Sequence, residues 1–199
     1  MFVRYESLNQ FMRLYPIVTG IVIIHIVLYI LTELLAITEL KGLLVGSNLH
    51  IALNGEYWRL ITPIFVHLSL PHVLFNTFSL ILFGPPLERI LGKTKFILTY
   101  LLMGIVGNVA TLYLDELLLV HAGASGAIYG IFGLYMYMIF MRKELIDPQS
   151  RQIIIVILII GVFMTFLRTN VNLYAHLFGF FAGLALGPIV LNRIKKIFY

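Results

Sequence analysis

Two residues in this sequence have side chains that could perform nucleophilic chemistry together. Ser125 lies in the segment HAGASGAIYG (121–130), surrounded by glycine and alanine at the start of an apolar stretch, and His176 lies near the start of another. A serine hydroxyl becomes a nucleophile when a base lies about 2.6–3.2 Å from it. The plainer interpretation is that Ser125 caps a helix or bonds to its own backbone, and the residue types alone leave both interpretations open.

The elements that carry these residues are predicted to be membrane-spanning helices. The chain has 199 residues, 60% of them hydrophobic, and its mean hydropathy is +0.98. A soluble domain cannot bury so much apolar surface, whereas about 20 apolar residues suffice to span a bilayer. We therefore predict an all-α membrane protein with six transmembrane helices in a single domain over residues 1–199. The charge-free runs are 14–32, 60–87, 96–114, 117–141, 152–167 and 169–192.

Two of these runs differ from a simple span. The first part of the second run, up to about Leu70, is expected to be a loop. The fifth run is slightly short, so Arg151 or Arg168 would have to extend its side chain to the membrane surface. The sequence contains no cysteine, which excludes disulfides and thiol catalysis.

The positive charges predict how the helices are oriented. With six spans and a cytoplasmic N-terminus, eleven of the 14 Lys and Arg residues lie in cytoplasmic segments and three lie outside. Lys and Arg collect on the cytoplasmic side of membrane proteins. We therefore expect a short cytoplasmic N-terminus (1–13), a basic cytoplasmic tail (193–199) and a long outer loop over about 36–69, with a turn at Gly46-Ser47-Asn48. This distribution explains the net charge of +5, and we do not predict nucleic-acid binding.

Four polar side chains are predicted to lie at a similar depth near the outer membrane face. Ser125, His176 and the pair His72 and Asn76 each lie near the outer start of a helix, and the i, i+4 spacing places His72 and Asn76 on one side of theirs. Small residues four apart let membrane helices pack closely, although most such patterns serve packing alone. They occur beside Ser125 and His176, at Gly126 and Gly130 and at Ala175, Gly179, Gly183 and Gly187.

The remaining histidines have plainer interpretations. His25, midway along the first run, has no identifiable partner, and His50, His67 and His121 lie in or near outer loops, where histidine is common. The sequence has no His-Glu-x-x-His motif, which is the pattern of many zinc proteases. We therefore expect no metal and no other cofactor.

Four motifs resemble those of the rhomboid intramembrane serine proteases. GEYWRLITPIFVHLSLPHVLFN (55–76) resembles the first outer loop and second helix of that family, and FGPPLE (83–88) resembles the end of the same helix. GASGAIYG (123–130) resembles the nucleophile motif, and AHLFGFFAGLALG (175–187) resembles the histidine helix. The resemblance covers about residues 50–190 and implies the minimal six-helix bacterial form of the rhomboid fold.

The resemblance implies catalytic roles. Ser125 would be the nucleophile and His176 the general base. His72, Asn76 and the backbone N–H of Ser125 would form the oxyanion hole. Neutral His176 would remove the serine proton as the hydroxyl attacks a peptide carbonyl. No Asp or Glu lies in the spans near His176, so we predict a Ser–His dyad rather than a triad.

Supporting roles are also implied. Gly123 would let the chain approach the site, and Tyr129 would pack on the ring of His176 and orient it. Trp58 and Arg59 match a structural pair in the outer loop of the family.

The expected substrates are transmembrane segments of other membrane proteins, cut near their outer ends in the lipid bilayer. A regular helix hides its carbonyl groups in hydrogen bonds, so segments with helix-weakening residues should be preferred. The short fifth helix is a candidate gate for entry from the lipid. The absence of a transit peptide and the small size favour the plasma membrane of a bacterium or archaeon.

Two other classes of protein are the alternatives. A catalytically inactive rhomboid-like protein that binds membrane clients is the main one, and the joint presence of Ser125 and His176 argues against it. A transporter or channel would require a charge or a broken helix near the midplane, where the sequence offers only His25.

Overall fold

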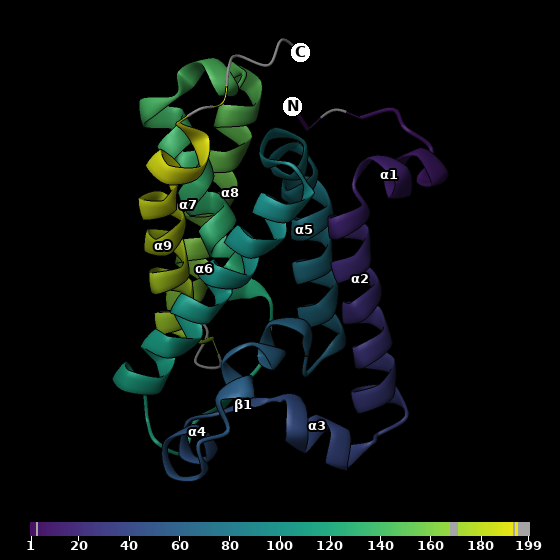
Figure 1. Ribbon diagram of the computed structural model, residues 1–199, viewed down its shortest axis with the longest axis vertical. Helices are drawn as coiled ribbons and strands as arrows, with labels where there is room; N and C mark the ends of the chain where they lie inside the picture. The colour runs from purple at the N-terminus through teal and green to yellow at the C-terminus, as the bar shows by residue number, and fades with distance from the viewer. Residues whose placement is uncertain (3, 168–170, 193, 195–199) are drawn as a thin grey trace.

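A computed structural model describes residues 1–2, 4–167, 171–192 and 194 of the chain, and helices dominate it (Figure 1). The α-helices are α1 (Leu8–Leu14), α2 (Pro16–Tyr29), α3 (Thr38–Leu44), α4 (Asn48–Asn54), α5 (Leu70–Leu91), α6 (Lys93–Leu114), α7 (Ser125–Met141), α8 (Pro148–Leu167) and α9 (Leu173–Leu191). Two-residue strands β1 (Gly46–Ser47) and β2 (Val120–His121) pair antiparallel. The shorter turns are the π-helix η1 (Ile30–Leu34) and the 3-10 helices η2 (Tyr57–Leu60), η3 (Thr62–Phe65) and η4 (Lys143–Leu145).

Five helical segments of the described chain are long and apolar enough to cross a membrane. They are Pro16–Leu34, which joins α2 and η1, and the helices α5, α6, α8 and α9. Helix α7 is apolar but has 17 residues, because the first part of the run predicted there forms β2 and a loop. The six-span count therefore stays a prediction, with α7 as its shortest member.

The starts of α5 and α8 can be compared with the predicted charge-free runs. The run from 60 contains no α-helix before α5 begins at Leu70, as the predicted loop requires, although it includes the short 3-10 helix η3. Ser69 caps α5 by accepting a hydrogen bond from the backbone of His72 at 3.4 Å. Helix α8 begins at Pro148 and so includes Arg151, which makes it longer than the charge-free run. The other predicted membrane-surface residue, Arg168, and the basic tail 193–199, apart from Ile194, lie outside the described residues.

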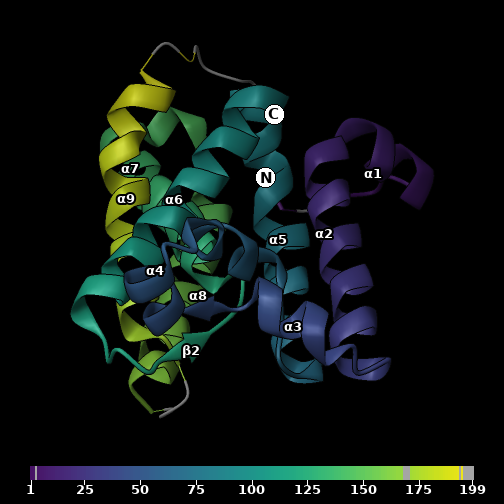
Figure 2. The same cartoon turned by 60° about the horizontal axis from the view of Figure 1, so that its bottom comes forward.

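Helices α6, α7 and α9 pack together, α8 lies beside them, and α2 lies along α5 (Figures 1 and 2). Helix α1 and the C-terminal end of α9 lie at one end of the bundle, and α3, α4 and β1 lie at the opposite end. This arrangement places the first residues of α5, α7 and α9 near the α3–α4 end. Which end faces the cytoplasm stays a prediction from the charges.

The predicted outer loop is an ordered structure. The prediction of a turn at Gly46-Ser47-Asn48 was wrong, because two of these residues form β1 and the third begins α4. Arg59 is buried and donates hydrogen bonds to the carbonyl oxygens of Gly42 at 2.7 Å and Val45 at 2.8 Å. Its Nε also lies 2.6 Å from the carboxylate of Glu56. Arg59 therefore holds the segment before β1 against η2.

Trp58 is partly exposed, whereas its neighbour Arg59 is buried. The Trp58 side chain is 45% exposed and its Nε1 donates to the carbonyl oxygen of Leu43 at 3.2 Å. The guanidinium of Arg59 lies 5.9 Å from the centre of the Trp58 ring. Together the two residues join η2 to the end of α3.

Candidate active site

Ser125 and His176 contact each other across two helices. Ser125 is the first residue of α7 and His176 lies in the first turn of α9. The serine Oγ lies 2.8 Å from Nε2 of the imidazole, which is the distance required for proton transfer between a nucleophile and its base. The histidine is 8% exposed and the serine is half-buried.

The Ser125 hydroxyl is not used to cap its own helix. The N-cap residue of α7 is Ala124, and no side chain caps the helix there. The first N–H groups of an α-helix have no partner within the helix, and they carry a partial positive charge. The start of α7 therefore offers backbone donors beside the serine hydroxyl, which suits an anion that forms next to it.

Glycines bring the backbones of α7 and α9 into direct contact. A Cβ atom built on Gly179 would lie 2.1 Å from the carbonyl oxygen of Gly126, and one on Gly183 would lie 1.9 Å from that of Gly130. Both distances are far below any real contact of a Cβ atom. Because Gly126 follows Ser125 and Gly179 lies one turn after His176, this contact sets the spacing between the two reactive side chains.

Helix α9 is also fixed against α6. The side chain of Asn172 caps α9 by accepting from the backbone N–H of Ala175 at 2.9 Å, and its Oδ1 also accepts from the hydroxyl of Thr111 on α6 at 3.0 Å. A Cβ on Gly107 would lie 2.7 Å from the carbonyl oxygen of Ala175. These contacts position the turn that carries His176, and sequence reasoning did not identify them.

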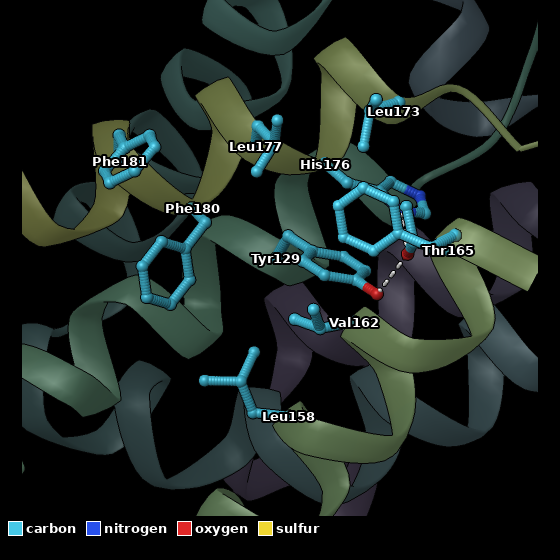
Figure 3. Close-up of a pocket in the computed structure, with 10 residues that line it drawn as sticks. Tyr129, Leu158, Val162, Thr165, Leu173, His176, Leu177, Phe180 and Phe181 are labelled. Carbon is cyan, nitrogen blue, oxygen red and sulfur yellow. Dashed lines mark hydrogen bonds between the residues drawn. The ribbon is translucent and has the colours of Figure 1, made fainter.

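Tyr129 stacks on the imidazole of His176. The ring centres are 4.1 Å apart and the planes are inclined by 13°. The tyrosine hydroxyl lies 2.8 Å from Oγ1 of Thr165 on α8 (Figure 3). The same Oγ1 lies 2.9 Å from Nδ1 of His176. The sequence-based prediction left orientation of the ring to packing alone, and it missed this polar contact.

The segment before Ser125 is held by backbone and histidine contacts. Gly123 has a φ of +128°, and a Cβ there would lie 2.5 Å from the ring of His72. Only glycine combines this backbone conformation with so close an approach. The N–H of Gly123 donates to the carbonyl oxygen of Pro63 at 2.8 Å, and that of Ala124 donates to Nε2 of His67 at 3.5 Å.

Three histidines form a row behind this segment. The ring centres of His25 and His67 are 4.6 Å apart, and those of His67 and His72 are 5.0 Å apart. His25 and His67 are completely buried, so the interpretation of His67 as an ordinary loop residue was wrong, and His25 has the partner that the sequence did not reveal. Burial, with His25 and His72 nearby, lowers the pKa of His67 to about 2, and neutral His67 can therefore accept the hydrogen bond from Ala124.

Asn76 is buried one turn after His72 on α5. Its side-chain amide donates to the carbonyl oxygen of His72 at 2.9 Å, which leaves one amide hydrogen for another acceptor. The hydrogen bonds of the described residues do not join Asn76 or the ring of His72 to Ser125. The structure thus brings His72 against the segment before the serine, and convergence of all three donors on one point stays a prediction.

A cavity of about 160 Å³ opens beside the imidazole. Its walls come from α7, α8 and α9, with Tyr129, Thr165 and His176 at one end and apolar side chains elsewhere (Figure 3). Among the residues that the structure describes, no cluster of three or more His, Asp or Glu side chains is arranged to hold a metal ion.

Comparisons with known proteins identify the family. Residues 54–193 match the family model of the Rhomboid domain. The chain is 46% identical over 198 residues to the YdcA protein of Bacillus subtilis, a candidate rhomboid protease by its name, with 98% of this chain and 99% of the relative covered. It is 38% identical to the rhomboid protease GluP of the same bacterium, covering 67% of this chain and 27% of GluP.

A third relative is also named as a rhomboid-like protease. Rhomboid-like protease 3 of Toxoplasma gondii is 35% identical over 138 residues, which cover 67% of this chain and 51% of that protein. The likeness and the apolar helices place this protein among multi-pass proteins of the cell membrane, as predicted. The resemblance inferred from the four motifs is confirmed, and the chain belongs to the rhomboid family.

Proposed function

We propose that this protein is an intramembrane serine endopeptidase that cuts transmembrane segments of other membrane proteins with a Ser125–His176 dyad. The observation that carries the proposal is the 2.8 Å contact between Ser125 Oγ and His176 Nε2. The relatives named as rhomboid proteases support the same class of reaction. The proposal includes six spans in a single domain, with both termini in the cytoplasm and the dyad toward the outer face.

The reaction proceeds by acyl transfer. His176 accepts the hydroxyl proton through Nε2 while Ser125 Oγ attacks the scissile carbonyl carbon, and the imidazolium then donates that proton to the leaving amine. Water, deprotonated by the same imidazole, then attacks the acyl-enzyme. The imidazolium returns that proton to Ser125 Oγ as the ester bond breaks and the second product leaves. The carbonyl oxygen becomes negatively charged in each addition step, and the donors assigned to it are the Ser125 N–H, His72 and Asn76.

The position of His72 supports its part in this assignment. A Cβ built on Gly123, two residues before the nucleophile, would lie 2.5 Å from the ring of His72, and its backbone rather than its ring serves the helix cap at Ser69. Among the residues that the structure describes, no hydrogen bond engages this ring, so its N–H can be offered to a substrate. Losing one donor of an oxyanion hole typically slows a reaction by about 10²–10³.

Cleavage of a model transmembrane substrate in liposomes tests the proposal. Wild type should cut the substrate, and Ser125→Ala and His176→Ala should both insert and fold but give no product. A fluorophosphonate probe should label wild type and fail to label Ser125→Ala, and EDTA should leave cleavage unchanged. Absence of both cleavage and labelling in folded wild type would favour the inactive protein that binds membrane clients.

A further inference from the structure

Nδ1, the second nitrogen of the His176 ring, faces a hydroxyl on a third helix. Thr165 lies near the end of α8, is 8% exposed, and places Oγ1 2.9 Å from Nδ1 of His176. The same oxygen lies 2.8 Å from the hydroxyl of Tyr129 and 2.9 Å from the carbonyl oxygen of Gly161. One threonine oxygen thus has three polar neighbours (Figure 3 shows Tyr129, Thr165 and His176).

The number of hydrogens available fixes the direction of all three bonds. A threonine hydroxyl carries one hydrogen and two lone pairs. The carbonyl oxygen of Gly161 can only accept, so the hydroxyl hydrogen of Thr165 points to it. The two lone pairs then accept one hydrogen from Tyr129 and one from Nδ1 of His176. In any other assignment, at least one of these three pairs of atoms would lie at hydrogen-bond distance with no hydrogen between them.

We infer that Thr165 is a positioning residue that holds His176 in the tautomer with its proton on Nδ1. This inference rests on the proposed function, because only that tautomer leaves Nε2 with a lone pair for the Ser125 hydroxyl. In a serine protease triad an aspartate performs this task for the histidine. Here a neutral hydroxyl from α8 performs it, and Tyr129 supports that hydroxyl.

The contact also couples the base to the position of α8. Most of the side chains of α8 are exposed on the surface of the described bundle, and Thr165 is one of its few buried residues. A sideways movement of the end of α8 would therefore remove the hydrogen-bond acceptor from Nδ1 before it disturbed the contact between α7 and α9. The tautomer of the base depends on α8 being in place.

Packing alone is the competing explanation, and an isosteric variant separates the two. Thr165→Val keeps the volume and removes the acceptor, whereas Thr165→Ser keeps the acceptor and removes a methyl group. Thr32→Val in η1 is a matched control, because Thr32 is also buried and its hydroxyl also bonds to the carbonyl oxygen four residues earlier. It removes a similar hydroxyl far from the dyad.

Cleavage kinetics in liposomes provide the first readout. We expect Thr165→Val to lower kcat about tenfold, which corresponds to about 1.4 kcal/mol, with KM unchanged. Thr165→Ser should restore kcat to within about twofold of wild type, and Thr32→Val should equal wild type. If Thr165→Val does not fold, Thr165→Ala replaces it in the comparison with Thr165→Ser. If Thr165→Ser had the same kcat as Thr165→Val, or as Thr165→Ala where that replaces it, the inference would be overturned.

The ring nitrogens provide a second readout that does not need activity. ¹⁵N spectra of histidine-labelled protein distinguish the two neutral tautomers, and comparison with His176→Ala identifies the signal. Wild type should carry the proton on Nδ1, and Thr165→Val should show a mixture of both forms. A wild-type ring with its proton on Nε2 would overturn the inference. If wild type cuts no substrate, the proposed function fails, while the spectra still test the assignment of the tautomer.

Discussion

Gly179→Ala should separate the two reactive side chains without touching either of them. The new Cβ would lie 2.1 Å from the carbonyl oxygen of Gly126, whereas ordinary contacts begin at 3.4 Å. The difference, 3.4 minus 2.1, is about 1.3 Å, and the neighbour is backbone, which cannot rotate away. Helices α7 and α9 must therefore move apart by about 1 Å.

This movement is enough to break the dyad. The Ser125–His176 distance of 2.8 Å would increase beyond 3.5 Å, where no useful hydrogen bond remains. A misplacement of about 1 Å in an active site can cost about 10² in rate, and a forced methyl group in a packed core costs about 1–3 kcal/mol of stability. We expect both effects in Gly179→Ala.

The assay compares cleavage rate, probe labelling and thermal unfolding in one detergent or liposome preparation. Gly20→Ala on α2 is the matched control, because a Cβ there meets nothing within 4 Å, and it should equal wild type in all three. Measurements are made well below the unfolding temperature, so that loss of rate reports on the folded protein. If folded Gly179→Ala cut its substrate as fast as wild type, the glycine contact would not set the distance within the dyad.

Three further changes test other parts of the molecule. Arg59→Met should lower the free energy of unfolding by about 3 kcal/mol, because it leaves buried carbonyl groups without a donor, and Arg59→Lys should recover only part of this in thermal unfolding. Asn76→Ala should retain about 0.1–1% of the cleavage rate if it removes one oxyanion donor, and full activity would exclude that role. Burial, partly opposed by a nearby carboxylate, lowers the pKa of His121 to about 4. Its neutral form is thus favoured by folding, so wild-type stability should be full above pH 6.5 and fall by about 3 kcal/mol as pH drops to 4; His121→Gln should lose less, and an equal loss would refute this cause.

The sequence predicts those elements and residues whose own composition or spacing is distinctive. Charge-free runs locate spanning helices because hydrocarbon admits little charge, and glycine spacing indicates close helices because a missing Cβ has a direct steric effect. The charge-free run 117–141 begins before α7, because β2 and its following loop are also free of charge. The positive φ of Gly123 ends that loop, and no composition rule distinguishes it from a helical glycine.

The contacts that the sequence did not reveal depend on distant segments. The pairing of β1 with β2 joins Gly46 to His121, and strands of two residues carry no periodic pattern. His25 and His67 meet across α2 and the loop before α5. Thr165 is one threonine in an apolar helix, where threonine is common, and its role depends on which face of α8 turns toward α9.

The neutral hydroxyl at Thr165 has a physical reason in the position of the site. A carboxylate would orient and stabilise an imidazolium more strongly, but an ionised group inside a membrane helix costs about 2.5–3.5 kcal/mol or more, and α8 turns most of its surface outward. A threonine bonded to the carbonyl oxygen of Gly161 keeps its own hydrogen satisfied within the helix. It therefore presents two lone pairs to Tyr129 and His176 without placing a charge inside the membrane. Because a hydrogen bond between neutral groups contributes about 1 kcal/mol, removing the Thr165 hydroxyl should lower kcat by no more than about tenfold. A much larger loss of kcat in Thr165→Val would mean that Thr165 does more than accept one hydrogen bond, and that the position of α8 sets the geometry of the dyad itself.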